Sequence, residues 1–157
     1  MPISDLDSFD RKILGELQTQ GRMTNQELAD KIGLSPSPCL RRLRQLEGSG
    51  VISGYVALVD PVAVGLTVTA FVRVRLDRQD DKHLATFEQV VAEFPEVMEC
   101  YLMSGDADYH LRVVVESLSA FESFLRYKLT KSPGVSQVTT SFGLRPVVYR
   151  TALPLKT

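Results

Sequence analysis

Several features that mark large classes of protein are missing from this sequence of 157 residues. No apolar run approaches the roughly 20 residues that a membrane-spanning helix needs, so we expect no membrane segment. The two cysteines, Cys39 and Cys100, form no CxxC motif, and the two histidines lie far apart, so no zinc-binding spacing is present. Internal repeats and low-complexity segments are absent as well. We therefore expect a protein without metal or cofactor.

An excess of positive charge is missing too. The chain carries 18 Lys and Arg against 19 Asp and Glu, which gives a net charge of −1. Because many nucleic-acid-binding proteins are strongly basic, any DNA contact must depend on positive charge concentrated in one place. The N-terminal segment is acidic and lacks the charged-then-apolar order of a secretory signal. We expect a cytoplasmic protein with unpaired cysteines, associated with the nucleoid if it binds DNA.

The first third of the chain has the pattern of three short helices. Asp7 and Asp10 can cap the first helix, and Thr24 and Glu27 form a capping box ahead of the second. Gly33 suits the left-handed residue that ends this second helix.

The third helix begins with two prolines, in the stretch LSPSPCLRRLRQLE (34–47). With Ser35 as N-cap, Pro36 and Pro38 occupy the first and third positions, where backbone N–H groups lack an acceptor within the helix. The prolines therefore start a helix instead of breaking it. They leave the Ser37 amide as the expected donor to the Ser35 side chain.

One side of this third helix is apolar and the other is polar and basic. At about 100° per residue, Cys39 falls on the apolar side, which makes it a core residue and not a redox sensor. A basic face can simply be solvated, but a short helix, a glycine-containing turn and a second helix with outward polar side chains form a helix-turn-helix, whose second helix enters the DNA major groove. Arg22 and Lys31 could contact phosphates or be ordinary surface charges. The residues expected to contact DNA are Ser37, Arg41, Arg42, Arg44 and Gln45.

From residue 66 onward the pattern changes to alternating strands with two further helices. Alternation over 67–76 predicts a strand, and strand patterns recur over 97–103, over 109–116 and from 135 onward. Helical spacing over 84–94 and a capping box of Ser119 and Glu122 place helices between them. The order β-α-β-β-α-β is that of a ferredoxin-like fold, in which both helices cover one face of the sheet.

The two faces of this sheet should differ. Even-numbered residues of the first strand suit the helix-covered face, as do the even-numbered residues 138–144 of the last strand. The other face, with Phe71, Thr139 and Ser141, is too apolar to be wholly wet, so we interpret it as a subunit interface. We therefore predict an α+β protein with a winged or helix-turn-helix three-helix domain (1–50), a β tether (51–64) and a ferredoxin-like domain (65–157).

This layout resembles the Lrp/AsnC family, the leucine-responsive or feast/famine regulators of bacteria and archaea. The resemblance covers almost the whole chain and is carried above all by LSPSPCLRRLRQLE (34–47) and SGDADYHLRVVV (104–115). It implies a sequence-specific transcriptional regulator of amino-acid metabolism or transport, and not an enzyme. It also implies homo-oligomers, built from dimers that form through the tether and the second domain, called the RAM domain, and that assemble further into tetramers or octamers.

The segment 103–110 has more polar groups than a hairpin needs. Its residues alone favour a structural interpretation, because Gly105 and Asp106 suit a turn and Asp108 can cap the loop backbone. The family resemblance implies instead that this loop lines an effector pocket between RAM domains, where a free L-amino acid binds. Backbone N–H groups can hold the carboxylate of such a ligand, and an aspartate can hold its ammonium group. The residues expected at this site are Met103, Gly105, Asp106, Asp108, Tyr109, Thr139 and Ser141.

Two other classes of function stay open on the residues alone. Asp106, Asp108 and His110 alternate onto one side of an extended strand and could form a catalytic or metal cluster, but no partner nucleophile, phosphate-binding glycine loop or second cluster accompanies them. A helix-turn-helix could also bind another protein, and an acidic or apolar outer face would favour that interpretation. The arginines of the third helix argue against it.

Overall fold

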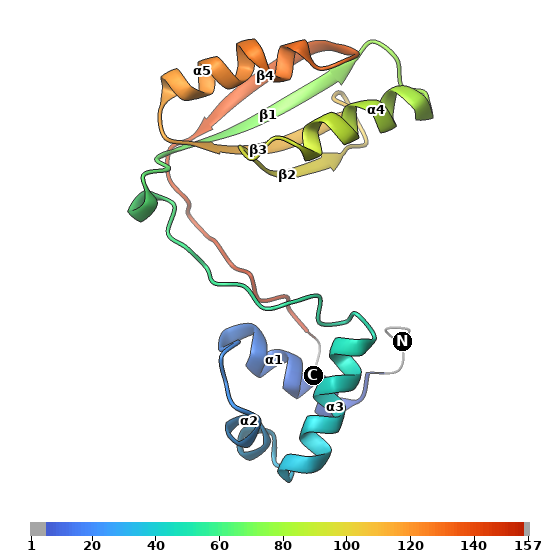
Figure 1. Cartoon of the computed structure of the whole chain (residues 1–157), viewed down its shortest axis with the longest axis vertical. Helices are drawn as coiled ribbons and strands as arrows, with labels where there is room; N and C mark the ends of the chain where they lie inside the picture. The colour runs from blue at the N-terminus through green and yellow to red at the C-terminus, as the bar shows by residue number, and fades with distance from the viewer. Residues whose placement is uncertain (1–5, 156–157) are drawn as a thin grey trace. The chain divides into compact units, whose positions relative to one another are not determined.

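The computed structural model describes residues 6–155 and divides the chain into two compact units (Figure 1). The first unit, which we call the headpiece, contains residues 6–58 together with residues 148–155 near the C-terminus. The second unit contains residues 59–147. Each unit has a hydrophobic core of its own, so the two are described separately.

The headpiece is built from the helices α1 (Ser8–Thr19), α2 (Asn25–Ile32) and α3 (Pro36–Gly48). The Asp7 side chain accepts hydrogen bonds from the amides of Phe9 and Asp10, and the Asp10 side chain accepts one from the Asp7 amide. Thr24 and Glu27 form the corresponding capping box at the start of α2. Each box satisfies N–H groups that the start of a helix otherwise leaves without partners. Both predicted caps are confirmed.

The turn between α2 and α3 depends on Gly33, which has a φ of 75° and ends α2 in the left-handed conformation, as predicted. Ser35 is the N-cap residue of α3, but its side chain makes no capping hydrogen bond, so the predicted bond from the Ser37 amide is wrong. Ser35 is exposed, and water can satisfy its hydroxyl. Instead, the Asn25 side chain anchors this end of α3 by donating to the Pro36 carbonyl over 2.9 Å.

The core of the headpiece lies between its helices. Cys39 is fully buried there, as predicted, and burial raises the pKa of its thiol. Val51 and Ile52 pack against this core where the chain leaves α3. The other buried side chains of the cluster are Ile13, Leu14, Leu28, Ala29, Ile32 and Leu46.

The tether does not form the strand that the sequence suggested. In the described part of the headpiece no residue is in a strand, so neither the β tether nor a paired wing is observed. Residues 54–59 are exposed, and a strand needs the backbone hydrogen bonds of a partner, which this stretch does not have. The tether is fixed to the headpiece by Tyr55, whose hydroxyl donates to Glu47 over 2.9 Å. Tyr55 as a whole is 49% exposed, but local desolvation of its hydroxyl and the Glu47 carboxylate raise its pKa to about 12, so the hydroxyl stays a donor at neutral pH.

The second unit is a four-stranded antiparallel sheet with two helices on one side (Figure 1). Its strand order, β2-β3-β1-β4, is that of the ferredoxin-like fold, so the predicted fold class is confirmed. In chain order the elements are β1 (Val68–Leu76), α4 (Asp81–Ala92), β2 (Val97–Leu102), β3 (Tyr109–Val115), α5 (Leu118–Tyr127) and β4 (Val135–Gly143).

Side chains of the sheet alternate between a buried face and an open face. The even-numbered residues of β1, such as Val72, are buried and belong to one cluster with Phe87 of α4 and Phe124 of α5. The odd-numbered residues of β1 lie on the other face, where Phe71 is 38% exposed. The prediction that both helices cover one face of the sheet is therefore confirmed.

Two local predictions in this unit are wrong. The N-cap of α5 is Ser117, whose hydroxyl accepts from the Ala120 amide, and Ser119 lies inside the helix. Ser117 follows β3 closely and keeps an extended backbone, which is the conformation that an N-cap needs. Leu144, expected on the helix-covered face, is 97% exposed because β4 ends one residue earlier, at Gly143.

The C-terminal segment also differs from the prediction. Residues 148–155 pack with the headpiece and not with the predicted 65–157 domain. Pro146 lies between this segment and β4, and a proline cannot donate to a strand ladder. After β4 the chain therefore returns to the headpiece, the unit for which the sequence predicts DNA binding.

Candidate functional site

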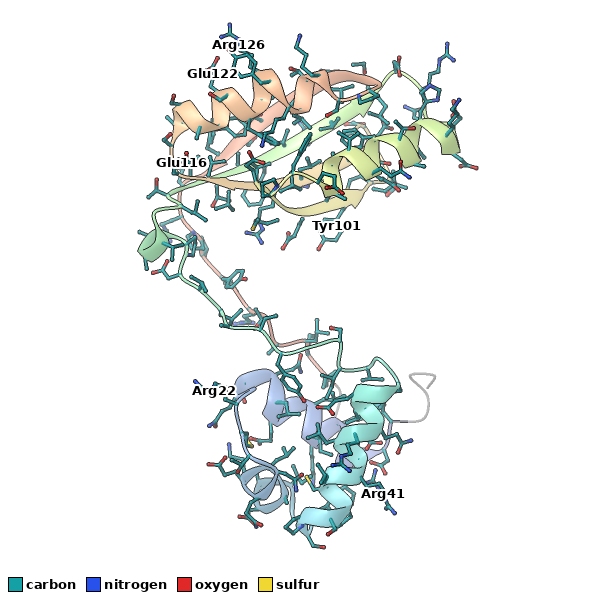
Figure 2. All side chains as sticks on the ribbon, viewed as in Figure 1. Arg22, Arg41, Tyr101, Glu116, Glu122 and Arg126 are labelled. Carbon is teal, nitrogen blue, oxygen red and sulfur yellow. The ribbon has the colours of Figure 1, made fainter. Side chains whose placement is uncertain are left out.

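The exposed face of α3 carries most of the side chains that were predicted to contact DNA. Ser37, Arg41, Arg44 and Gln45 are exposed, whereas Cys39 on the opposite side of the helix is buried. Figure 2 shows Arg41 projecting outward from α3. A guanidinium group in this position can donate two parallel hydrogen bonds to guanine or bind a phosphate.

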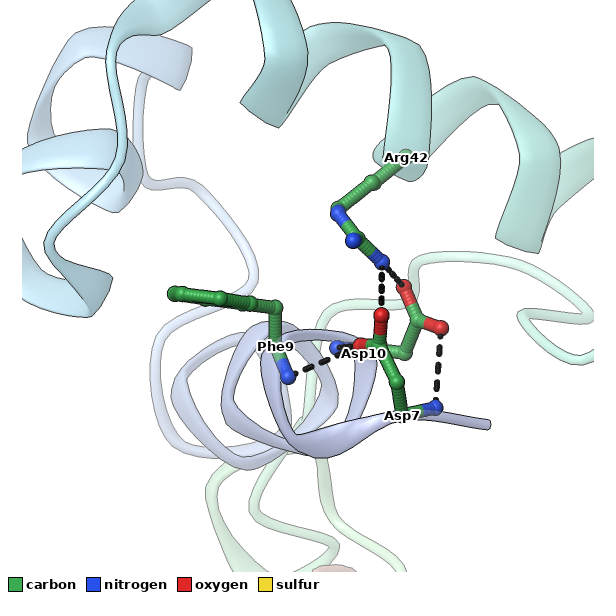
Figure 3. A network of polar contacts seen from close by, with 4 residues as sticks. All are labelled: Asp7, Phe9, Asp10 and Arg42. Atoms are coloured by element: carbon green, nitrogen blue, oxygen red, sulfur yellow. Dashed lines mark hydrogen bonds and ion pairs between the residues drawn. The ribbon is translucent and has the colours of Figure 1, made fainter. Parts of the chain in front are cut away.

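Arg42 is held in a different way (Figure 3). Its Nη1 donates to Asp7 Oδ2 over 2.7 Å and to Asp10 Oδ1 over 2.9 Å. The Asp10 side chain is only 8% exposed and that of Arg42 is 26% exposed. The guanidinium also lies 5.5 Å from the centre of the Phe9 ring, within cation–π range. Arg42 therefore joins α3 to the first turn of α1, and this position does not suit the predicted contact with DNA.

Electrostatics stabilise this junction. The hydrogen bond from the Asp10 amide, helped by Arg42, holds the pKa of Asp7 below its ordinary value of 3.8. The hydrogen bond to Asp10 raises the pKa of Arg42, which is charged at any physiological pH. The three groups therefore form a permanent ion-pair network that fixes the position of α3 on α1.

The two accessory phosphate contacts considered from the sequence also differ in their surroundings. Lys31 pairs with Glu16 of α1, with 2.9 Å between Nζ and Oε2. Arg22, in the turn between α1 and α2, is exposed (Figure 2). Of these two cations, Arg22 is therefore the better placed to meet a phosphate.

The loop between β2 and β3 is bound to the end of β1. The Asp108 carboxylate accepts a hydrogen bond from the Leu76 amide over 2.7 Å, and the Asp108 amide donates to the Val74 carbonyl over 2.9 Å. Gly105 has a φ of 134°, a conformation that only glycine adopts readily. The two bonds from Asp108 hold this side of the loop against the end of β1.

A hollow of about 310 Å³ lies between this loop and the open face of β1 and β4. Arg75 donates from its guanidinium to the Asp106 carbonyl, and so joins the strand to the loop. In the register of the sheet, Arg73 is opposite Thr139 and Arg75 is opposite Gln137. Two arginines and an aspartate therefore line one small space, and these residue types suit a ligand that carries both charges. The lining residues are Arg73, Arg75, Asp106, Ala107, Gln137 and Thr139.

Asp106 and Thr139 are the two predicted effector residues that line this hollow. Tyr109 is 1% exposed on the helix-covered face, where its hydroxyl donates to Glu88 over 2.7 Å, so it does not suit the predicted role. Asp108 is engaged with the end of β1 and has a structural role. Met103, Gly105 and Ser141 lie outside the lining of the hollow.

The sequence analysis missed four residues that line the hollow: Arg73, Arg75, Ala107 and Gln137. The alternation of β1 did place Arg73 and Arg75 on the open face, so the sequence indicated which face of the sheet carries them. The sequence did not indicate the pairing of β1 with β4, which brings Gln137 and Thr139 beside these arginines. No short-range pattern specifies this pairing.

A second hollow of about 310 Å³ lies between α4 and β2 and includes Val91, Met98 and Leu102 in its lining. Cys100 also lines it; although this residue is exposed, desolvation of its thiol, with a smaller effect of Glu88, raises the pKa of the thiol to about 11. At neutral pH the thiol is therefore protonated and a weak nucleophile.

The catalytic interpretation of Asp106, Asp108 and His110 receives no support from the geometry. Asp108 is bonded to the Leu76 amide, and the His110 ring packs near Phe71, with 6.0 Å between ring centres. Among residues 6–155, no three histidine, cysteine or carboxylate side chains are grouped as ligands of one metal ion.

Comparison with known proteins assigns both units. A model of winged helix-turn-helix DNA-binding domains matches residues 6–53, and a model of the Lrp/AsnC ligand binding domain matches residues 69–153. The Bkd operon transcriptional regulator of Pseudomonas aeruginosa is 44% identical over 98% of this chain and 100% of its own length. The leucine-responsive regulatory protein of Escherichia coli is 40% identical over 99% of this chain and 95% of its own. This chain belongs to the Lrp/AsnC family.

Solved Lrp/AsnC structures have the same fold. A transcriptional regulator from Neisseria meningitidis in complex with L-Met has a TM-score of 0.90 at 41% identity, over 95% of this chain and 96% of that one. Escherichia coli AsnC has a TM-score of 0.85 at 26% identity, over 93% and 97% of the two chains.

Family membership makes the protein a DNA-binding transcriptional regulator with a ligand-binding domain, and not an enzyme. The ligand-binding model extends to residue 153, so the family pattern includes most of the tail that packs with the headpiece. Within the described residues, no helix has the length and apolarity that crossing a membrane requires.

Proposed function

We propose that the protein is a homo-oligomer that reads repeated DNA half-sites through α3 and responds to a free L-amino acid bound in the hollow beside the β2–β3 loop. It acts in the cytoplasm on DNA of the nucleoid, at genes of amino-acid metabolism or transport. The observation that carries the DNA part is the exposed pair Arg41 and Arg44, on a helix that Arg42 fixes to α1. Ser37 and Gln45 flank this pair on the same exposed face.

The DNA contacts can be tested with an operator selected from a random DNA pool by the parent protein. Arg41→Ala and Arg44→Ala should each weaken binding about tenfold or more, because each removes a base or phosphate contact. Arg126→Ala is the matched control, since Arg126 is an exposed arginine of α5 that pairs with Glu122. Gel-shift titrations that give parent affinity for both α3 variants would refute the assignment.

The charge of the chain and the open face of the sheet support the proposed assembly. The whole chain has a net charge of −1 and therefore no strong general attraction for DNA, so several headpieces must act on one DNA molecule. The open face offers an aromatic surface through Phe71, at 38% exposure, and Tyr101, at 60% exposure. A dimer through this face presents two α3 helices to half-sites about 10 to 10.5 bp apart, or multiples of that distance.

Sedimentation measurements test this interface. Phe71→Asp should shift the protein towards monomers, because it would bury a charge without a partner. Tyr127→Asp is the control, since this exposed aromatic residue lies on α5, away from the open face. A parent protein that is a monomer at micromolar concentration would refute the assembly.

The hollow supports an amino acid as the effector. Within the described residues no carboxylate forms an ion pair with Arg73, so its guanidinium can receive the carboxylate of a ligand. The Asp106 side chain can receive the ammonium group, and Thr139 can bond to either end. The relative from Neisseria meningitidis was solved with L-Met, which supports an amino-acid ligand of this size.

Calorimetric titration with each of the twenty amino acids identifies the effector. Arg73→Ala and Asp106→Ala should each weaken binding about tenfold or more, because each removes a charge-assisted bond. Arg78→Ala is the matched control, since Arg78 is exposed in the same unit and does not line the hollow. The effector proposal fails if no amino acid binds the parent protein, or if both variants keep its affinity. Transcript profiles with and without the effector then define the regulated genes.

A further inference from the structure

The C-terminal tail is bound to the first helix of the headpiece through backbone and side chain together. The Leu153 amide donates to Gln18 Oε1 over 2.6 Å, and Gln18 Nε2 donates back to the Leu153 carbonyl over 3.3 Å. The side-chain amide of Gln18 therefore bonds to both the N–H and the C=O of one tail residue, as the backbone of a neighbouring β-strand does. The described end of the chain lies beside α1 (Figure 1).

Apolar packing fixes the same segment. Leu155 is half-buried and packs against the headpiece core, although it is far from that core in sequence. Its amide donates to the Leu153 carbonyl over 2.9 Å, which turns the chain so that the side chain reaches the core. The residues between Val148 and Leu153 are exposed, so the contact is concentrated at the end of the tail.

This contact gives the two units a second connection. The chain passes between them once near residue 58 and again near residue 147. The second passage starts from β4, which carries Gln137 and Thr139 of the hollow. A body that is held by two chain segments explores fewer orientations than a body held by one.

We propose that residues 148–155 are a latch on the DNA-binding headpiece. When the latch is docked at Gln18, the headpieces of an assembly are restrained and reach two half-sites together. When it is undocked, each headpiece hangs on its tether alone and the second half-site is bound less often. This inference rests on the proposed assembly and its reading of repeated half-sites.

Hydrogen exchange of the full chain tests the docking without DNA. In Gln18→Ala and in Leu155→Ala the amide of residue 153 should exchange at least about tenfold faster than in the parent, because its acceptor is lost or no longer held in place. Gln89→Ala is the matched control, since Gln89 is an exposed glutamine of α4 in the other unit. Unchanged exchange at residue 153 in both variants would overturn the latch.

DNA binding tests the consequence, with one selected half-site and with two half-sites in phase. The latch variants should lose about fivefold in affinity for the double site and keep the parent affinity for the single site. Equal losses on both DNAs would mean that the tail only stabilises the headpiece, and unchanged affinity on both would mean that docking has no function. Either result overturns the proposal. A parent protein that does not prefer the double site refutes the proposed multivalent reading itself, and the parent is measured first for this reason.

Discussion

Replacing Arg42 with methionine should weaken the junction between α3 and α1 without removing a DNA contact. The variant keeps an unbranched, largely apolar side chain but leaves Asp10, at 8% exposure, without its cation. The remaining contact of this carboxylate in the network is the Asp7 amide, at 3.2 Å. Breaking a buried ion pair from one side costs about 3–5 kcal/mol, because the remaining charge is buried and unpaired.

The loss here should be smaller than that range. Arg42 is 26% exposed and Asp7 is 48% exposed, so water compensates part of the missing interaction. We expect the headpiece to lose about 2 kcal/mol of stability. For a unit of this size, that corresponds to a fall of about 10 °C in its melting temperature, which calorimetry of the full chain can measure.

Arg41→Met is the matched control, because Arg41 neighbours Arg42 on the same helix and is exposed. It should leave the headpiece stability within about 0.5 kcal/mol of the parent. It should also reduce the slope of log affinity for DNA against log salt concentration by about one. Arg42→Met should lower the headpiece stability but leave the salt dependence of DNA binding unchanged, measured at a temperature where its headpiece is folded. The reasoning is refuted if Arg42→Met melts like the parent and reduces this slope by about one, since Arg42 would then contact DNA.

Three further predictions follow from single contacts. The folded-state pKa of Asp7 is lowered, so its contribution to stability is complete above the ordinary value of 3.8 and is lost as the pH falls towards the lowered value; calorimetry should find a smaller acid loss in Asp7→Asn. Gly33→Ala should destabilise the headpiece by about 1 kcal/mol, because a φ of 75° is strained for alanine, and the melting of residues 59–147 should not change. Asp108→Ala should destabilise the second unit by about 1–2 kcal/mol in urea unfolding, because the Leu76 amide loses its acceptor.

Local signals made most of the fold predictable. The capping boxes at Asp7 and Thr24 span four residues each, and the alternation of β1 needs only its own sequence. A helix cap or a strand face is set by neighbours in the chain, so the sequence contains the whole interaction. Even the wrong N-cap of α5 was an error of two residues, between Ser117 and Ser119.

The role of Arg42 could not be predicted in the same way. A helical wheel places this residue near the border of the polar face, but it does not show what lies beside that border. The partner carboxylate of Asp10 is 32 residues away, and the packing of α1 against α3 brings the two together. The sequence showed an aspartate in the first turn of one helix and an arginine near the border of the polar face of another. Only the tertiary structure shows that these two side chains form an ion pair.

The hollow that we propose for the effector was predictable in part for the same reason. The loop was found from its own composition, and Asp106 does line the hollow. Arg75 meets the Asp106 carbonyl from 31 residues away, and Gln137 depends on the register between β1 and β4. A one-residue change in that register would turn Gln137 and Thr139 to the other face, so their presence is a property of the sheet and not of any short stretch.

The use of charge in the headpiece connects its structure with its regulation. Arg42 of α3 and Lys31 of α2 are both held by carboxylates within the headpiece, so the exposed arginines of α3 are Arg41 and Arg44, the pair that we propose contacts DNA. Each phosphate contact contributes about 0.9 to the slope of log affinity against log salt concentration. A headpiece with few such contacts therefore binds DNA weakly by itself. Joining headpieces makes the second contact intramolecular and can raise avidity by about 100-fold or more. In the oligomer that we propose, a change in the assembly therefore changes DNA binding far more than a modest change in one headpiece would. The hollow lies on the open face of the sheet, where we propose that subunits meet, so a small zwitterion bound there would act on the step with the largest effect.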